Sequence, residues 1–193
     1  MKKFFARTLI CTMLFGAGFG FTSCDSETIA AIIEQAVSLL QQGTPYTFNG
    51  KCTATSLLGP ADDNGTYQSD TTIVLNNLTS QVSVNSTSTA ATLAIAGFTC
   101  GSLQMEEVTF SNLELGTSSD GKSNTLTVGD NSSATGSVTY NGKSYDVTNL
   151  FIECTLNDQN INITQMSIYF GNESNYDICV MNITYEGKIQ VTQ

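Results

Sequence analysis

The sequence predicts an all-β protein, an antiparallel barrel of about eight to ten strands preceded by one short N-terminal helix. Beyond residue 45, apolar side chains recur at every second position, which is the period of a strand with one buried face. Gly, Asn and Asp separate these runs. The parity of the apolar positions changes twice between residues 103 and 115, which predicts the bulges or breaks with which closed barrels turn corners. A two-sheet sandwich is the alternative.

Residues 1–23 have the pattern of a lipoprotein signal peptide. Three positive charges open the chain, an apolar stretch over residues 9–21 follows, and small residues precede Cys24. The apolar stretch is shorter than the roughly 20 residues that a membrane span needs. We therefore expect cleavage before Cys24 and an outer-membrane lipoprotein, periplasmic or surface-facing, held by acyl chains on that cysteine. Simple secretion and a retained membrane helix are the alternatives.

The mature chain is strongly acidic. Removal of the leader leaves 170 residues, enough for one domain, with four lysines, no arginine and 17 acidic residues, a formal charge of −13. Such a surface repels phosphate backbones, so we expect no nucleic-acid partner. Because the acidic residues are scattered, the pattern is typical of a soluble, self-repelling surface.

Residues 24–44 are predicted to form a lipidated N-terminus and a short amphipathic helix. Ile29, Ile32, Ile33 and Ala36 recur at three- and four-residue spacing, and Gly43 ends the pattern. The apolar stripe is expected to pack against the β-barrel domain, residues 45–193. Docking on another protein is the alternative.

The predicted strands each place apolar side chains on one face. In chain order these side chains are Tyr46, Phe48, Cys52 and Ala54; Ile73 and Leu75; Val82 and Val84; Leu93 and Ile95; Leu126 and Val128; Leu150, Ile152, Cys154 and Leu156; Ile161 and Ile163; Met166, Ile168 and Phe170; Cys179, Met181, Ile183 and Tyr185; Ile189 and Val191. Period two with polar partners indicates sheets with one solvated face.

The clearest turn is Asn141-Gly142, because both residues tolerate the positive φ angles of a type I′ hairpin. A two-residue loop then predicts two cross-strand pairs, Tyr140 with Lys143 and Val138 with Tyr145. A second turn is expected at residues 157–160 and a looser loop at residues 118–122.

Several segments resemble a known family. They are YTFNG at residues 46–50, GF at 97–98, GSL at 101–103 leading into VTFSNL at 108–113, and YFG at 169–171. With its leader, the chain resembles the calycin-like β-barrel lipoproteins of Bacteroidetes from about residue 45 to the end. The resemblance implies an up-and-down antiparallel barrel of about eight strands, without an established activity. True calycins close one end of the barrel with a Trp and an Arg, and the mature chain lacks both.

Four cysteines remain in the mature domain: Cys52, Cys100, Cys154 and Cys179. In an exported chain they predict up to two disulfides, and four buried free thiols are the alternative. Their wide spacing and the absence of histidine argue against a zinc site, so we expect neither a metal nor a cofactor.

The sequence favours a non-enzymatic protein. A serine nucleophile usually needs a base, and the chain has no histidine. Glycoside hydrolysis requires two carboxylates that face one cleft, and the sequence does not place such a pair. A hydrolase is therefore the third functional hypothesis, behind the two described below. The run Asp70-Thr71-Thr72 resembles a short O-glycosylation acceptor at Thr71, with an ordinary strand start as the alternative.

The leading functional hypothesis is an envelope lipoprotein that binds a small apolar or glycan-like ligand within or at the mouth of the barrel. The candidate ligand-lining residues are Tyr140, Tyr145, Tyr169 and Tyr185, although tyrosine is also common in strands as packing. The competing hypothesis is a structural or adhesion module with a filled core. An interior packed with side chains and free of voids would favour this second hypothesis.

Substitution of the lipid-accepting cysteine tests the anchor. Cys24→Ser is expected to release the protein from membranes, because no acyl chain can then be attached. Fractionation of cell envelopes followed by immunoblotting checks this. Sedimentation of the variant with the envelope would contradict the anchor.

Overall fold

Twelve β-strands form one antiparallel sheet in the structure, a computed structural model that describes residues 45–59, 67–85, 89–119, 121, 123–157, 159–172 and 175–190. The strands are β1 (Tyr46–Leu58), β2 (Gln68–Val84), β3 (Ala90–Ile95), β4 (Phe98–Cys100), β5 (Leu103–Met105), β6 (Val108–Thr117), β7 (Asn124–Thr127), β8 (Ser133–Thr135), β9 (Ser137–Tyr140), β10 (Lys143–Leu156), β11 (Asn160–Asn172) and β12 (Asn175–Ile189). The predicted leader, Cys24 and the predicted helix lie outside the described residues.

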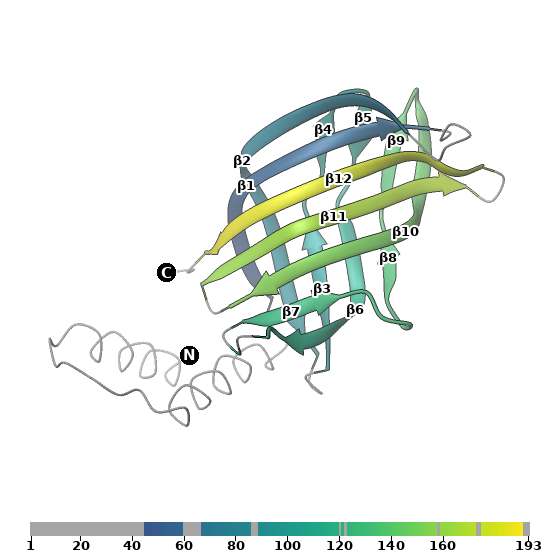
Figure 1. The fold of residues 1–193 in the computed structure, drawn as a ribbon. Helices are drawn as coiled ribbons and strands as arrows, with labels where there is room; N and C mark the ends of the chain where they lie inside the picture. Colours follow the sequence, from purple (N-terminus) through teal and green to yellow (C-terminus); the bar gives the residue numbers. More distant parts are fainter. Residues whose placement is uncertain are drawn as a thin grey trace, which may run out of the picture. The chain divides into compact units, whose positions relative to one another are not determined.

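Eight of the strands form a closed ring in chain order: β1, β2, β3, β6, β7, β10, β11 and β12. The ring closes because β12 pairs with β1, from Phe48 opposite Ile189 to Leu58 opposite Cys179. Figure 1 shows the yellow β12 lying between β1 and β11. The fold is therefore the predicted antiparallel up-and-down barrel, and the sandwich alternative is wrong.

The other four strands, β4, β5, β8 and β9, continue three of the ring strands beyond short breaks. Strand β4 follows β3, β5 precedes β6, and β8 and β9 follow β7 along the chain. Their pairings repeat the order of the ring, with β4 on β5, β5 on β9 and β9 on β10. Three of the eight barrel strands are thus interrupted rather than continuous.

The interruptions lie side by side across the barrel wall, forming a line that we call the crease. A Cβ atom on Gly97 would lie 2.6 Å from the Met105 carbonyl oxygen, and one on Gly136 would lie 2.8 Å from the Glu107 carbonyl oxygen. These glycines are required because the neighbouring backbone approaches so closely, and Gly136 also has a φ of 135°. The crease therefore bends three adjacent barrel strands at one level.

The two predicted changes of parity both correspond to features of the structure. The first is the break at Glu106 and Glu107, between β5 and β6. The second is a bulge in β6 at Asn112, which has a φ of 56°, opposite the register shift between Ala91 and Leu93 on β3. Asparagine tolerates this left-handed conformation better than most residues, so the bulge has a local cause.

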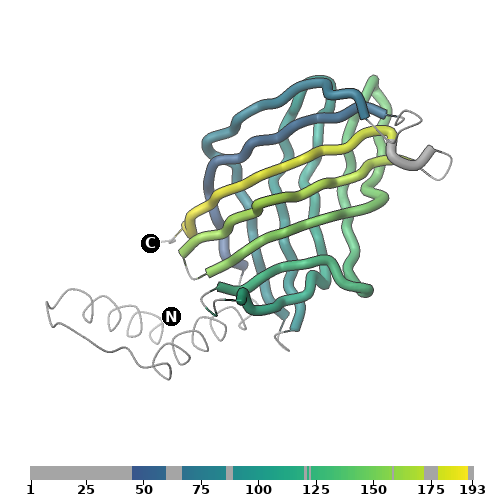
Figure 2. The backbone as a smooth tube through the Cα atoms, viewed as in Figure 1, coloured from purple at the N-terminus to yellow at the C-terminus, as the bar shows by residue number. Residues whose placement is uncertain are grey.

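Two long strands replace pairs of shorter ones suggested by the sequence. Strand β2 continues through the exposed Asn76 and Asn77, where its register against β1 shifts, and Figure 2 shows its backbone as one bent tube. Strand β11 likewise continues through the exposed Thr164 and Gln165, where its register shifts against both neighbours. In each strand an inserted polar residue changes the parity without ending the strand.

The predicted hairpin is confirmed in both its turn and its register. Asn141 and Gly142 have φ values of 49° and 72°, and Tyr145 lies opposite Val138 as expected. The predicted turn at residues 157–160 joins β10 to β11, and the Asn157 side chain accepts the backbone N–H of Asn160 at 2.7 Å. Local turn chemistry therefore determines both connections.

Side chains fill the interior of the barrel. Among the largest are Phe48, Phe110, Phe170 and Tyr185, each at most 1% exposed. Because a water-sized void beside a side chain would expose part of its surface, none borders Phe110 or Phe170, which have no exposed surface. Ile95, Ile152 and Ile168 are also buried, whereas Leu75 is half-buried and packs against the edge of the core. The hydrophobic effect of this enclosed core is the main source of stability.

Truncation of a core phenylalanine should destabilise the barrel strongly. Phe110→Ala is expected to lower the free energy of unfolding by about 3–5 kcal/mol, because it removes buried apolar contacts and leaves a cavity. The matched control is Phe151→Ala, since Phe151 is 42% exposed and its truncation should cost clearly less, about 1 kcal/mol. Urea denaturation of both variants measures the difference, and equal losses would contradict the assigned core.

Candidate functional site

The barrel wall opens between β10 and the segment that contains β7 and β8. Strand β10 pairs with β9 over residues 143–146 and with β7 over residues 154–156. Between these two contacts, β8 remains paired with β6 instead. Over residues 149–153, no strand in the described part of the chain pairs with this side of β10. Two strand edges therefore face each other across an opening.

Chain length explains why the wall opens here. The segment from Asn124 to Tyr140 has 17 residues, whereas β10 opposite has 14. The excess forms a turn at residues 128–132, in which Ser132 N donates to the Gly129 carbonyl oxygen at 3.0 Å. The Ser132 hydroxyl donates to the Asn112 carbonyl oxygen at 2.8 Å, which fastens the turn to the β6 bulge. The opening is thus bordered by a hydrogen-bonded turn.

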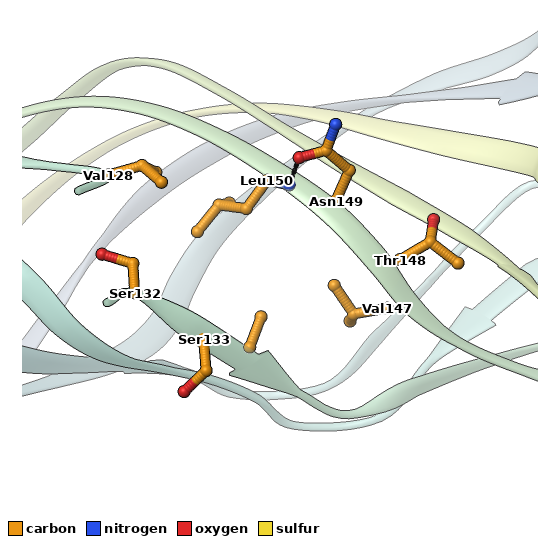
Figure 3. A pocket seen from close by; sticks show the side chains of 8 residues that line it. Val128, Ser132, Ser133, Val147, Thr148, Asn149 and Leu150 are labelled. Atoms are coloured by element: carbon orange, nitrogen blue, oxygen red, sulfur yellow. Dashed lines mark hydrogen bonds between the residues drawn. The ribbon is translucent and has the colours of Figure 1, made fainter. Parts of the chain in front are cut away.

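The opening forms a groove of about 200 Å³, which we call the seam groove. It is lined by Val128, Ser132, Ser133, Ala134, Val147, Thr148, Asn149 and Leu150. Figure 3 shows Val147 and Leu150 on β10 across the space from Ser132 and Ser133. Ala134, Val147 and Leu150 also pack against the core, so the groove has an apolar floor and a polar rim.

At the β10 edge of the groove, a side chain supplies a backbone hydrogen bond that a neighbouring strand would normally make. Val147 N donates to the Gly136 carbonyl oxygen at 3.2 Å, which is the last backbone contact before the opening. The next inward-facing residue, Leu150, donates its N–H to the side-chain oxygen of Asn149 at 2.8 Å (Figure 3). An exposed amide side chain thus occupies the place that the carbonyl of a neighbouring strand would take.

The surroundings of the seam groove are acidic. Asp130 lies on the turn at its rim, and Asp146 and Glu153 are exposed on β10 on either side of the open stretch. None of its lining residues is basic. The field at the groove therefore favours cationic groups over anionic ones.

A second depression of about 320 Å³ lies on the outer face of β1, β12 and β11. Its lining residues are Lys51, Thr53, Asn162, Ile163, Thr164, Thr184, Tyr185 and Glu186. Lys51 and Glu186 are cross-strand partners, and most of the others are polar. Since Tyr185 is 1% exposed, the depression offers no exposed aromatic ring on which a sugar could stack.

The four predicted ligand-lining tyrosines do not come together. Tyr140 and Tyr145 lie on the β9–β10 hairpin, half-buried against the core. Tyr185 is buried, and its hydroxyl donates to the Leu78 carbonyl oxygen at 3.1 Å. Burial raises the pKa of the Tyr185 phenol. Tyr169 lies between the inward-facing Ile168 and Phe170 and so faces outward.

The four cysteines of the domain are free thiols in the structure, and all are buried. Burial raises the pKa values of Cys52, Cys154 and Cys179 to about 12, and for Cys52 the nearby Cys100 adds to the effect. These thiols are therefore protonated and unreactive at neutral pH. Cys100 contributes a weak hydrogen bond from Sγ to the Ala54 carbonyl oxygen at 3.5 Å.

Thr71, the predicted O-glycosylation acceptor, directly follows Asp70, whose carboxylate accepts hydrogen bonds within the fold. Asp70 Oδ2 accepts both the backbone N–H and the hydroxyl of Ser102 at 2.8 Å, and the Ser56 hydroxyl at 3.2 Å. These bonds fasten the β4–β5 turn to the start of β2. The hydrogen bonds from Ser102, and then that from Ser56, hold the pKa of Asp70 below its usual value. Thr71 itself is half-buried.

The sequence did not indicate the seam groove. Its residues belong to two segments, 128–134 and 147–150, whose proximity depends on the register of the closed ring. One signal was present: regular apolar alternation stops after Val128, and Ala134 is the next apolar residue before Val138. A gap of this kind in a barrel strand can mark a local departure from the wall.

Comparison of the chain with models of known families, with curated proteins and with solved structures finds no match in any of the three. Within the described residues, no group of three or more His, Cys, Asp or Glu side chains is placed to hold a metal ion. No helix in the described part of the chain is long and apolar enough to cross a membrane. The assignment of function therefore rests on the geometry of the barrel.

The Asp70 contacts predict a pH-dependent contribution to stability. At pH 7, Asp70→Asn is expected to lower the urea midpoint of unfolding, because it removes the charge that Ser102 and Ser56 stabilise. Since the folded pKa lies below the usual 3.8, the wild type loses this contribution progressively as pH falls from about 3.8 through that lower value. The two midpoints should converge in strong acid.

The control for this prediction is Asp146→Asn, which removes an equal charge from an exposed position on β10. It should change the midpoint much less at pH 7, because exposed charges contribute little. An Asp70→Asn effect that is the same at pH 7 and in strong acid would show that the carboxylate charge does not fasten the turn.

Proposed function

We propose that this is a non-enzymatic, lipid-anchored protein of the cell envelope that acts as a binding module through the outer surface of a filled barrel. The observation that carries the proposal is the interior packing. Phe48, Phe110, Phe170 and Tyr185 occupy the space in which hollow barrels of eight strands hold a ligand. Recognition must then use the wall, where the seam groove offers apolar and polar groups together.

Binding of a small apolar or glycan-like ligand at the wall is the second candidate. The seam groove favours it because Val147 and Leu150 form an apolar floor beneath a rim of hydroxyl and amide groups. Its volume of about 200 Å³ is below the range of roughly 300–1,000 Å³ typical of small-molecule sites. A short contact with a larger partner therefore fits the groove better than an enclosed small molecule.

Two further features support the proposal. The chain has no histidine, and the thiols of Cys52, Cys154 and Cys179 are protonated at neutral pH, so the usual side-chain bases and nucleophiles are scarce. The eight-stranded ring agrees with the architecture that a calycin-like lipoprotein would have. Anchoring at Cys24 in the outer membrane, periplasmic or surface-facing, is the part of the proposal that rests on the leader alone.

Benzene binding tests whether the barrel interior is filled. Isoleucine methyl NMR spectra of the full chain should show no shift at Ile95 or Ile168 when benzene is added, because no space borders these side chains. Leu93→Ala is the positive control, since it should leave an apolar cavity that admits benzene. Saturable shifts at both methyl groups in the wild type would show an interior site and overturn the proposal.

A further inference from the structure

We infer that the outer face of the barrel binds a neutral oligosaccharide, with one sugar in the second depression and a neighbouring sugar stacked on the ring of Phe151. The inference rests on the proposed function, because it gives a module that binds through its outer surface a ligand of defined chemistry. The depression and Phe151 share one face, because β1, β12, β11 and β10 are successive neighbours in the barrel wall (Figure 1).

The second depression lies at a bulge in β11. Thr164 and Gln165 of β11 together oppose the single residue Thr184 of β12. The Thr164 hydroxyl donates to the Glu153 carbonyl oxygen at 3.2 Å, which fastens the bulge to β10, on the side away from the depression. Inserted residues of this kind redirect side chains and are frequent beside functional sites. The depression is therefore determined by the backbone of the sheet.

The side chains that line the depression suit the hydroxyl groups of a sugar. Thr53, Asn162 and Thr184 make no side-chain hydrogen bond within the described part of the chain, so their hydroxyl and amide groups are open to a ligand. Hydroxyl and amide groups both donate and accept hydrogen bonds, as sugar hydroxyls do. The volume of about 320 Å³ is within the range of roughly 300–1,000 Å³ typical of small-molecule sites.

The depression carries no net charge, although the domain is strongly acidic. Lys51 and Glu186 line it as cross-strand partners of opposite sign. The next charges on the same face, Lys188 and Glu153, are also of opposite sign. Because neither an anion nor a cation gains from such a balanced field, a neutral ligand fits best.

Phe151 provides an apolar surface beside the depression. It faces outward on β10 between the inward-facing Leu150 and Ile152, and it is 42% exposed. Among the described residues, no other aromatic side chain is exposed to this extent. A sugar ring has an apolar C–H face that packs on an aromatic ring. The Phe151 ring is therefore available for a sugar to stack on.

The ring and the depression are close enough for one short oligosaccharide to contact both. Phe151 lies two residues from Glu153, which pairs with Gln165 in the bulge. A separation of one strand and two residues corresponds to about 8 Å. Between the two sites, the Ser167 hydroxyl donates to the Asn182 side-chain oxygen at 2.8 Å. The connecting surface is thus polar and hydrogen-bonded.

The depression also lies inside the sheet rather than at an edge. Strand β12 pairs with β1 on one side and with β11 on the other, so the backbone offers no edge to an extended peptide. Recognition here depends on hydroxyl, amide and aromatic side chains, which favours a sugar over a peptide.

The test uses the full chain and a panel of neutral polysaccharides: starch, xylan, mannan, galactan, dextran and β-glucan. In affinity gel electrophoresis at least one of them should retard the protein, whereas the acidic polymer polygalacturonate should not. An NMR titration with a short oligosaccharide of the retarding polymer should then shift the amide signals of Thr164 and Thr184. This second readout locates the sugar without relying on any variant.

Substitution of the exposed ring tests the stacking. Phe151→Ala should weaken binding about tenfold, because the contact between the sugar and the ring is lost. Phe151→Tyr keeps an aromatic ring and should bind like the wild type. The matched control is Val128→Ala, which truncates a side chain that is 41% exposed at the seam groove and should leave the affinity unchanged. Equal affinities of the wild type and Phe151→Ala would overturn the inference.

Replacement of one hydroxyl tests the depression itself. Thr184→Val keeps a β-branched side chain of similar shape but removes a hydrogen-bonding group, so it should weaken binding about fivefold. The matched control is Thr127→Val, at an exposed position on β7 outside the site, which should bind like the wild type. An unchanged affinity of Thr184→Val would show that the depression holds no sugar.

The remaining outcomes distinguish this inference from the proposed function. Failure of every neutral polysaccharide to retard the protein, or retardation by polygalacturonate alone, would overturn the inference. Amide shifts confined to residues 147–150 would overturn it as well, because they would place the sugar in the seam groove. Each of these results leaves a filled barrel that acts through another part of its surface. Entry of benzene into the wild-type interior would instead remove the proposed function, whatever the sugar result.

Discussion

Pairing between the first and last strands is the constraint on which the structure depends. An antiparallel sheet with free edges exposes unpaired backbone groups, and closure into a ring removes both edges at once. Here β1 and β12 pair along most of their length, which encloses the aromatic and aliphatic side chains on a single inner face. Loss of this pairing would expose the core and two strand edges together, so the closed ring and the filled interior depend on each other.

Closure requires curvature, and the chain obtains it from interruptions placed side by side. Gly97, the break at Glu106 and Glu107, and Gly136 lie at one level across three neighbouring strands. Inserted residues in β2, β6 and β11 add further bends elsewhere. The seam groove arises from one of these interruptions, because the segment beyond β7 contains more residues than β10 can pair with. Structural irregularity and candidate function therefore coincide at one place in the wall.

Local patterns predicted much of the fold. Alternation identified the inward-facing residues, the Asn141-Gly142 dipeptide determined a hairpin register, and changes of parity indicated the breaks in β5–β6. The predicted tyrosine site did not form, because alternation gives the face of a residue but not its position around a ring. The Asp70–Ser102 contact and the seam groove were missed for the same reason, since both join segments that are distant in sequence and leave no periodic signal.

Because β1 and β12 are neighbours, the order of the strands along the chain can change without changing the barrel. Gln190 N donates to the Thr47 carbonyl oxygen at 2.7 Å, so the two ends of the barrel domain meet at one rim. A circular permutant that joined these ends and opened the chain between Asn141 and Gly142 would retain every ladder of the ring. The covalent order of the strands is thus one of several that the same barrel could tolerate.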